Sequence, residues 1–267
     1  MRFSAALAFL SLSLSFSALA APPGAASVAA PAPAAAAPPA PAPRAGAAPA
    51  PPVGAAPSAA KPAQPIRSAL QITEPGSNQK YGSPLSVDGK SYTLVGTGLR
   101  QTPQAKLYSM ALYVEDTARV SFPAVYDRAG RSRAGLKAEN RAQNFFTWGH
   151  FGKLAVLRYL RATPKEEIQQ AFREGLADLL TPQAPPDMHK DAQTFIALFD
   201  TDLAEGQELR LISDDIGHLD VYLDGKKKAA PQNAKLCRHI WDIWLGWHPP
   251  NKEMRFSLLE RLDVLAK

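Results

Sequence analysis

Two neighbouring segments rich in β-branched, aromatic and aliphatic residues, 89–100 and 106–116, constrain this fold more than any other part of the chain. Segments of this length and composition are typical of β-strands. The five residues between them, Gln101 to Ala105, include a proline and favour a turn. The spacing therefore predicts an antiparallel hairpin with a short connection.

The second predicted strand has two apolar faces. Residues two apart along a strand point to the same side. One face carries Tyr108, Met110, Leu112 and Val114, and the other carries Leu107, Ser109, Ala111 and Tyr113. Because both sets are mainly apolar, we expect other elements to cover the hairpin on both sides.

The first predicted strand contains Gly96 and Gly98 and ends at Arg100. The two glycines lack the third glycine and the strand-to-helix context of a dinucleotide site, and they predict a bulge or a close approach of another backbone. Arg100 is a permanent cation beside a hydrophobic hairpin. Together with Tyr108 it could face one cavity, where a guanidinium and a phenol suit a carboxylate or phenolate. On spacing alone, an exposed turn arginine and a core tyrosine remain the alternative.

Residues 1–20 are predicted to be a secretory signal peptide. A short basic start precedes an apolar run and the small-residue motif Ala18-Leu19-Ala20. The alternative, a membrane anchor, is disfavoured because the run is shorter than the roughly 20 residues that span a bilayer. We therefore expect a periplasmic or secreted protein with no transmembrane segment after signal cleavage.

Residues 21–68 are almost entirely alanine and proline. Proline prevents continuous helix and few large apolar side chains are present, so this stretch is predicted to be a disordered tether. Residues 69–267 are then one domain, which is large enough to bury its own core.

Charge and cysteine content exclude several classes of function. The net charge is +6, and with no recognition motif we expect no nucleic-acid partner. The basic run Lys226 to Lys228 follows Asp224-Gly225 and is interpreted as a solvated hairpin turn. The single cysteine, Cys237, lies in an apolar helical pattern and is expected to be a buried, inert thiol. The five histidines show no metal-binding spacing, so neither a metal nor a cofactor is expected.

The remaining chain alternates clusters of strands and helices. Thr163-Pro164-Lys165-Glu166 predicts a helix start with Thr163 as N-cap and a capping box. A second hairpin is predicted over 208–223, and Asn251 is expected to cap the last helix. Clustering of this kind favours an α+β fold with helices packed on one face of an antiparallel sheet.

Three motifs carry a family resemblance. They are Gly89-Lys90-Ser91-Tyr92 followed by 96–100 and 106–116, then Phe151-Gly152-Lys153-Leu154, and then Ile243-Trp244-Leu245-Gly246-Trp247-His248-Pro249. Together and in this order they resemble the signatures of the chalcone isomerase-like family, over about residues 87–267. The resemblance implies an open-faced β-sandwich, in which helices cover a large antiparallel sheet and a ligand cleft lies between them.

This family includes isomerases that close a chalcone to a flavanone, and non-catalytic members, some of which bind fatty acids. The resemblance matches Arg100 to the family arginine that binds a phenolate or a fatty-acid carboxylate. It places Tyr108 where the isomerases have a catalytic threonine and the fatty-acid-binding branch has a tyrosine. Ile168, Gly175 and Ile243 fall where the isomerases have a tyrosine, an asparagine and a threonine or serine. Isoleucine and glycine side chains cannot polarise a ketone or position a water, so no catalytic residue is assigned.

We therefore expect an exported, non-catalytic binder of a small amphipathic acid resembling a fatty acid, with Arg100 and Tyr108 as its ligand-binding residues. The alternative is an intramolecular lyase or isomerase that acts on a chalcone- or flavonoid-like phenol. A third possibility is a structural or interaction module whose cleft is filled.

Overall fold

The fold is described from a computed structural model, for residues 70–246, 249 and 251–267. The predicted signal peptide and the tether over 21–68 lie outside the described residues. Within the described part, no helix is long and apolar enough to cross a membrane.

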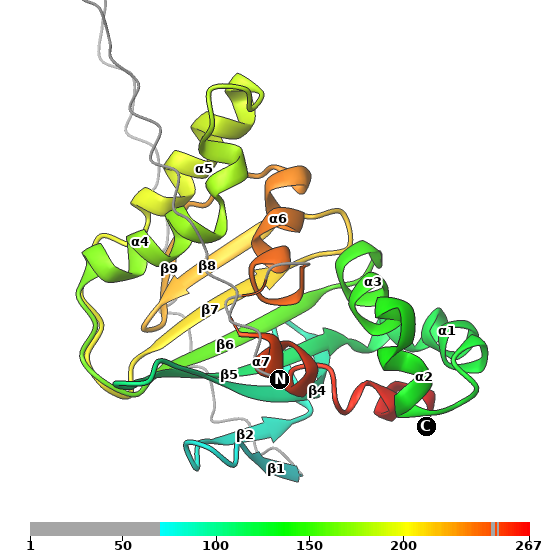
Figure 1. The fold of residues 1–267 in the computed structure, drawn as a ribbon. Helices are drawn as coiled ribbons and strands as arrows, with labels where there is room; N and C mark the ends of the chain where they lie inside the picture. Colours follow the sequence, from blue (N-terminus) through cyan, green and yellow to red (C-terminus); the bar gives the residue numbers. More distant parts are fainter. Residues whose placement is uncertain (1–69, 247–248, 250) are drawn as a thin grey trace, which may run out of the picture. The chain divides into compact units, whose positions relative to one another are not determined.

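A seven-stranded antiparallel sheet forms the centre of the domain (Figure 1). Its strands follow the order of the chain, so each strand pairs with the next one. They are β3 (Leu85–Val87), β4 (Lys90–Gln101), β5 (Lys106–Glu115), β6 (Lys153–Tyr159), β7 (Glu208–Ser213), β8 (Leu219–Leu223) and β9 (Lys226–Lys228). The predicted hairpin is confirmed as β4 and β5, which are joined by residues 102–105.

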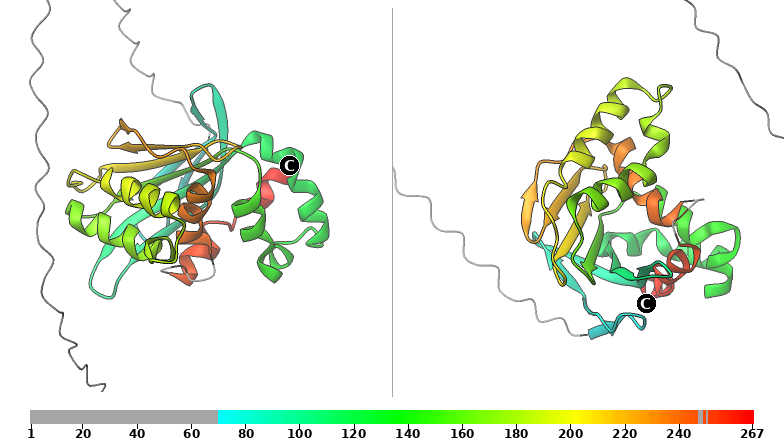
Figure 2. Two further views of the ribbon diagram at one scale, coloured as in Figure 1. Left: turned by 90° about the horizontal axis from the view of Figure 1, so that it is seen from above. Right: turned by 60° about the vertical axis from the view of Figure 1, so that its left-hand side comes forward.

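Helices gather on one face of this sheet, as the two views in Figure 2 also show. They are α1 (Phe122–Arg128), α2 (Arg133–Lys137), α3 (Arg141–Trp148), α4 (Lys165–Gly175), α5 (Pro186–Ala197), α6 (Ala234–Leu245) and α7 (Lys252–Ser257). Short 3₁₀ segments lie between or after them, at Asp116–Val120, Ala138–Asn140, Ala177–Leu180 and Leu262–Ala266. The prediction of an α+β fold with a large antiparallel sheet and helices is confirmed.

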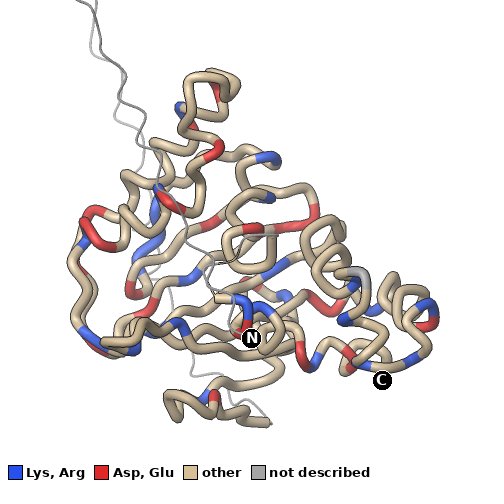
Figure 3. The backbone as a smooth tube through the Cα atoms, in the orientation of Figure 1, with Lys and Arg blue, Asp and Glu red and all other residues tan. Residues whose placement is uncertain are grey.

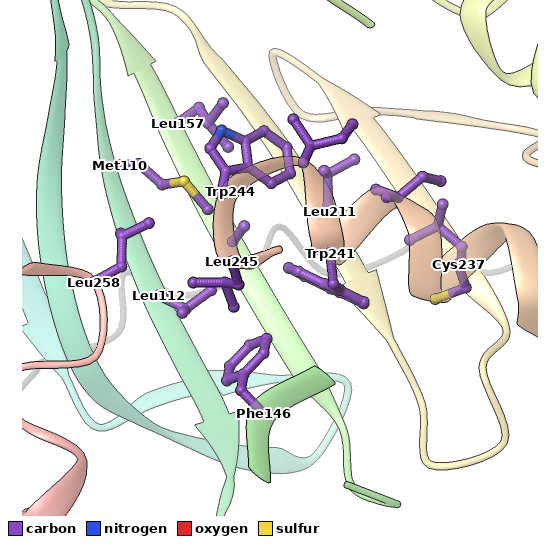
Figure 4. Close-up of a cluster of buried hydrophobic side chains, with 14 of the residues drawn as sticks. Met110, Leu112, Phe146, Leu157, Leu211, Cys237, Trp241, Trp244, Leu245 and Leu258 are labelled. Atoms are coloured by element: carbon purple, nitrogen blue, oxygen red, sulfur yellow. The ribbon is translucent and has the colours of Figure 1, made fainter. Parts of the chain in front are cut away.

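The core between helices and sheet is built around α6. Trp241 and Leu245 of α6 lie against Leu112 of β5 and Phe146 of α3, and all of them are buried (Figure 4). Cys237 is buried in the same cluster, as predicted, and burial raises the pKa of its thiol. An amphipathic helix that buries this much aromatic and aliphatic surface fixes its own position on the sheet.

The opposite face is covered by a separate two-stranded sheet, β1 (Leu70–Thr73) and β2 (Lys80–Ser83). A second buried cluster forms there, including Tyr81 of β2 and Ala111 and Tyr113 of β5. Met110, Leu112 and Val114 belong to the cluster under the helices. The predicted division of β5 into two covered faces is therefore confirmed.

Gly96 and Gly98 allow a backbone to pack directly on β4. A Cβ atom on Gly96 would lie 2.3 Å from the backbone of Leu258, and one on Gly98 would lie 2.8 Å from the Met254 side chain. The register of β4 against β5 also shifts between Leu94 and Gly96. Both parts of the sequence interpretation, a bulge and a close approach, are confirmed.

Two local predictions are wrong. The side chain of Thr163 does not cap α4, because its hydroxyl donates to the carbonyl of Arg161, and Asp202 instead accepts from the N–H of Lys165 at 2.9 Å. Lys226–Lys228 is not turn but the edge strand β9, which pairs with β8. The turn itself is limited to Asp224 and Gly225, which both have positive φ.

Asn251 does cap α7, since its side chain accepts from the N–H groups of two following residues.

Candidate functional site

A cleft of about 860 Å³ lies between the sheet and helices α4 and α6. Its floor comes from the ends of β4, β5 and β6, and its walls from α4, the 3₁₀ segment after it, and α6. The volume falls within the roughly 300–1,000 Å³ of small-molecule sites. Most of the inner lining is hydrocarbon or aromatic, from Leu157, Ile168, Phe172, Leu176, Ile243 and Trp244.

The structure brings both predicted ligand-binding residues to this cleft. Arg100 and Tyr108 are direct register partners across β4 and β5, so their side chains leave the sheet on the same face. Tyr108 in turn pairs with Tyr159 of β6, and the two rings lie 5.9 Å apart between centroids. A cation and two phenols thus form a row across three strands at the floor of the cleft.

Tyr108 is oriented by a residue from a distant part of the chain. The indole Nε1 of Trp244 lies 2.9 Å from the Tyr108 hydroxyl oxygen. An indole N–H can only donate, so the hydroxyl accepts here and keeps its own proton to donate elsewhere. Burial raises the pKa of Tyr108, although Trp244 and the Arg100 charge oppose that rise. The phenol therefore stays protonated at neutral pH, as a hydrogen-bond donor must.

The cleft walls are apolar at the positions that the family resemblance assigns to isomerase chemistry. Ile168, Gly175 and Ile243 all line the cleft, and none carries a polar side chain. Gly175 also sets how closely α4 approaches α6, since a Cβ there would lie 2.9 Å from Ile243. These three residues can enclose a hydrocarbon chain, but their side chains cannot donate or accept a proton.

The outer rim of the cleft is polar. On the α4 side, Glu167 forms an ion pair with Arg161, and Glu174 and Asp178 are exposed. On the α6 side lies Asp242, whose pKa burial raises despite nearby His239, Thr147 and Arg238. A polar rim over an apolar interior is the arrangement expected for an amphipathic ligand.

Sequence reasoning missed Trp244 as the partner of Tyr108. The sequence analysis placed Trp244 in an apolar helical stripe and in the C-terminal motif of the family resemblance. That motif was the one signal that connected Trp244 to the site. The two residues are 136 positions apart, so no local spacing predicts their contact. Among the described residues, no group of three or more His, Cys, Asp or Glu side chains could hold a metal ion. The absence of a cofactor stays a prediction.

Comparisons with known proteins agree with this architecture. A family model described as chalcone isomerase-like matches residues 136–260. The chain is 24% identical over 207 residues to fatty-acid-binding protein 1 of Arabidopsis thaliana. The aligned region covers 70% of this chain and 69% of that protein. The crystal structure of a fatty-acid-binding protein of Arabidopsis thaliana (AtFAP1) superposes with a TM-score of 0.60 at 19% identity, over 74% of this chain and 99% of that one. At that identity the structural likeness concerns the fold alone.

Proposed function

Because this chain belongs to the chalcone isomerase-like family, we propose that it binds one small amphipathic acid, such as a fatty acid, in the cleft between the sheet and α4 and α6. Arg100 binds the carboxylate as the charged anchor, and Tyr108 donates a second hydrogen bond to it. The hydrocarbon tail lies against the apolar walls. The relation to a fatty-acid-binding protein, at 24% identity, supports this choice of ligand class.

One observation carries the proposal: Arg100 and Tyr108 are register partners on a single cavity whose inner walls are apolar. Hydrogen bonds to a charged group are stronger than neutral ones, and more so where water is excluded. The bond from Trp244 fixes the phenol while leaving its proton available to a carboxylate oxygen. Burial of the tail supplies binding energy in proportion to the apolar area it removes from water.

The alternative, an isomerase that acts on a flavonoid-like phenol, has less support. Its reaction needs groups that polarise a ketone or position a water, and Ile168, Gly175 and Ile243 bring none to the cleft. We expect purified protein mixed with a chalcone to leave the substrate absorbance band decaying at the uncatalysed rate. Faster decay that depends on protein concentration would favour the enzyme.

The binding proposal is tested by removing the charge from either side of the contact. Arg100→Ala is expected to weaken binding of a long-chain carboxylic acid by about 2 kcal/mol, or roughly 30-fold. The methyl ester of the same acid should bind the natural protein about as weakly as the acid binds the variant. Titration calorimetry on delipidated full-length protein measures both dissociation constants.

Arg158→Ala is the matched control, because Arg158 is also an arginine beside a tyrosine ring but on the other face of the sheet. It should leave the dissociation constant unchanged. Equal affinity of the natural protein for acid and ester would contradict the assignment of Arg100. Native mass spectrometry of the protein as purified would show a retained lipid directly.

We further propose that the protein is exported and acts in the periplasm or outside the cell. The basic start, apolar run and small-residue motif over 1–20 support this proposal. Fractionation of expressing cells should place the mature protein in the periplasmic or secreted fraction, with Ala21 as its first residue by N-terminal sequencing. An intact Met1 in a cytosolic fraction would contradict it.

A further inference from the structure

Two exposed aromatic rings, each with a cation over its face, lie beside the cleft. Trp148 at the end of α3 is 60% exposed, and the Arg238 guanidinium lies 4.2 Å from its ring centroid. Phe256 of α7 is 37% exposed, with Arg255 at 5.1 Å and Lys137 at 6.0 Å from its centroid. Because these rings are exposed, they contribute little to the core, and a large exposed apolar side chain with a cation over it indicates an interaction surface.

Both aromatic–cation pairs are fixed to the same stripe of α6. Arg238, Asp242 and Gly246 are spaced four residues apart, so they succeed one another along one side of the helix and its C-cap, about 6 Å per step. Thr147, which precedes Trp148, lies near Asp242 and lowers the pKa of its carboxyl. Arg255 donates to the carbonyl of Gly246 at 2.9 Å. Since Asp242 and Gly246 also line the cleft, the pairs flank its rim.

We propose that this α6 rim, defined as Trp148, Arg238, Arg255, Phe256 and Lys137, docks on an anionic lipid bilayer. Aromatic rings with a polar or charged neighbour favour the boundary between headgroups and acyl chains, and lysine and arginine are attracted to anionic headgroups. Figure 3 shows basic positions in α7. Docking by this rim would bring the cleft beside a membrane, so that an acyl ligand passes between the two; this second step rests on the proposed function.

Charge differs between the two sides of the cleft, which gives the docked protein an orientation. Helices α6 and α7 carry four basic and two acidic side chains, a net charge of +2, whereas α4 and the 3₁₀ segment Ala177–Leu180 carry two basic and four acidic ones, a net charge of −2. An anionic surface attracts the first side and repels the second. The cleft is therefore expected to lie at the edge of the contact, with α4 turned toward water.

The test uses delipidated full-length protein and vesicles of phosphatidylcholine, with or without 30% phosphatidylglycerol. Co-sedimentation is expected to show at least about tenfold tighter binding to the anionic vesicles, and the difference should shrink as salt is raised. The double variant Trp148→Ala, Phe256→Ala should weaken that binding about tenfold or more. Trp148 is 60% exposed but Phe256 only 37%, so a small fall in the unfolding midpoint is expected, and binding is compared well below the midpoints of both proteins.

Ile216→Ala is the matched control. Ile216 is 62% exposed, but it is aliphatic and lies in the turn between β7 and β8. Equal binding to both kinds of vesicle, or an equal loss with Ile216→Ala, would overturn the proposal and leave the rim to a protein partner. Calorimetry with soluble fatty acid separates the two proposals: docking without fatty-acid binding refutes the carrier function alone, and fatty-acid binding without docking refutes this inference alone.

Discussion

Each face of the central sheet has an arginine next to a tyrosine, but the surroundings of the two pairs differ. Under the helices, Arg100 and Tyr108 lie side by side at a cleft of about 860 Å³. On the opposite face, Arg158 lies 4.8 Å from the ring centroid of Tyr81, beneath the strands β1 and β2. There the guanidinium donates to Glu208 at 2.7 Å and to the carbonyl of Lys80 at 2.7 Å.

The two faces differ in whether a cavity adjoins the residues and in which groups the tyrosine hydroxyls hydrogen-bond. On the β1–β2 side, the Tyr81 hydroxyl bonds to Ser109 at 2.8 Å, and that of Tyr113 donates to the carbonyl of Gly82 at 3.1 Å. These bonds tie one sheet to the other. On the helix side, the hydroxyl of Tyr108 accepts from Trp244 and keeps its own proton available to donate. An arginine beside a tyrosine therefore indicates a site only where a cavity adjoins it.

The largest effect that tests this comparison is on stability, at Tyr81. Tyr81→Ala removes a buried ring from the smaller cluster and is expected to lower the free energy of unfolding by about 3–5 kcal/mol, as for other buried aromatic residues. Urea denaturation measures this loss. The milder Tyr81→Phe removes only the bond to Ser109, at about 1 kcal/mol, and should leave fatty-acid affinity unchanged. A tenfold change in that affinity would show that the β1–β2 face contributes to binding.

A second test concerns Lys153, a cation at the far end of the helix-covered face. It is only 6% exposed, and its ammonium donates to the carbonyl of Gly149 and lies 5.0 Å from the Phe151 ring centroid. Burial lowers the pKa of Lys153 from 10.5 to about 8. Lys153→Met should therefore raise the free energy of unfolding at pH 7, by about 1–2 kcal/mol after the lost hydrogen bond is deducted.

The pH dependence of this gain has a definite sign. Below pH 8 the amine is charged in both states, so the natural protein bears the full cost of burial. Between about pH 8 and 10.5 the unfolded state binds a proton that the folded state does not, and stability rises with pH. The advantage of Lys153→Met should therefore shrink over that range, as followed by urea unfolding at pH 7, 9 and 10.5. A variant less stable than the natural protein at pH 7 would mean that the ammonium contacts outweigh burial.

The smallest expected effect is at Arg158. Burial alone would raise the pKa of Glu208, but hydrogen bonds from Arg158 and Arg210 lower it overall. Because Arg158 is partly exposed, Arg158→Ala should reduce the free energy of unfolding by only about 1 kcal/mol at pH 7. The loss should fade in acid, as the pH drops through the folded-state pKa of Glu208 and the natural protein loses the same interaction. A loss that persists undiminished at low pH would assign the effect to packing on Tyr81.

Much of the fold could be predicted because its strongest signals are local. The alternation in 106–115 and the turn residues before it specify a hairpin with two covered faces, and Asn251 carries its own capping chemistry. The predictions failed where a distant residue took over a local role, as Asp202 did at the start of α4. The strand β9 was missed because three consecutive lysines lack the apolar and β-branched residues typical of a strand. An edge strand nevertheless tolerates lysines.

The candidate site was predictable only in part. Arg100 and Tyr108 share a strand pair, and the family resemblance singled them out. Most of the remaining lining comes from α4 and α6, whose apolar stripes look the same in sequence whether they fill a core or border a cleft. Only the three-dimensional spacing of those helices, set in part where Gly175 meets Ile243, distinguishes the two cases.

The two glycines of β4 have a consequence for when this domain can mature. Leu258 packs directly against Gly96, and the N–H of Arg261 donates to the carbonyl of Val95 at 2.9 Å. The strand that presents Arg100 is thus completed by residues that the ribosome adds long after it. A nascent chain that lacks residues 258–261 would leave that strand half-covered, so the cleft can take its full shape only after those residues have been added.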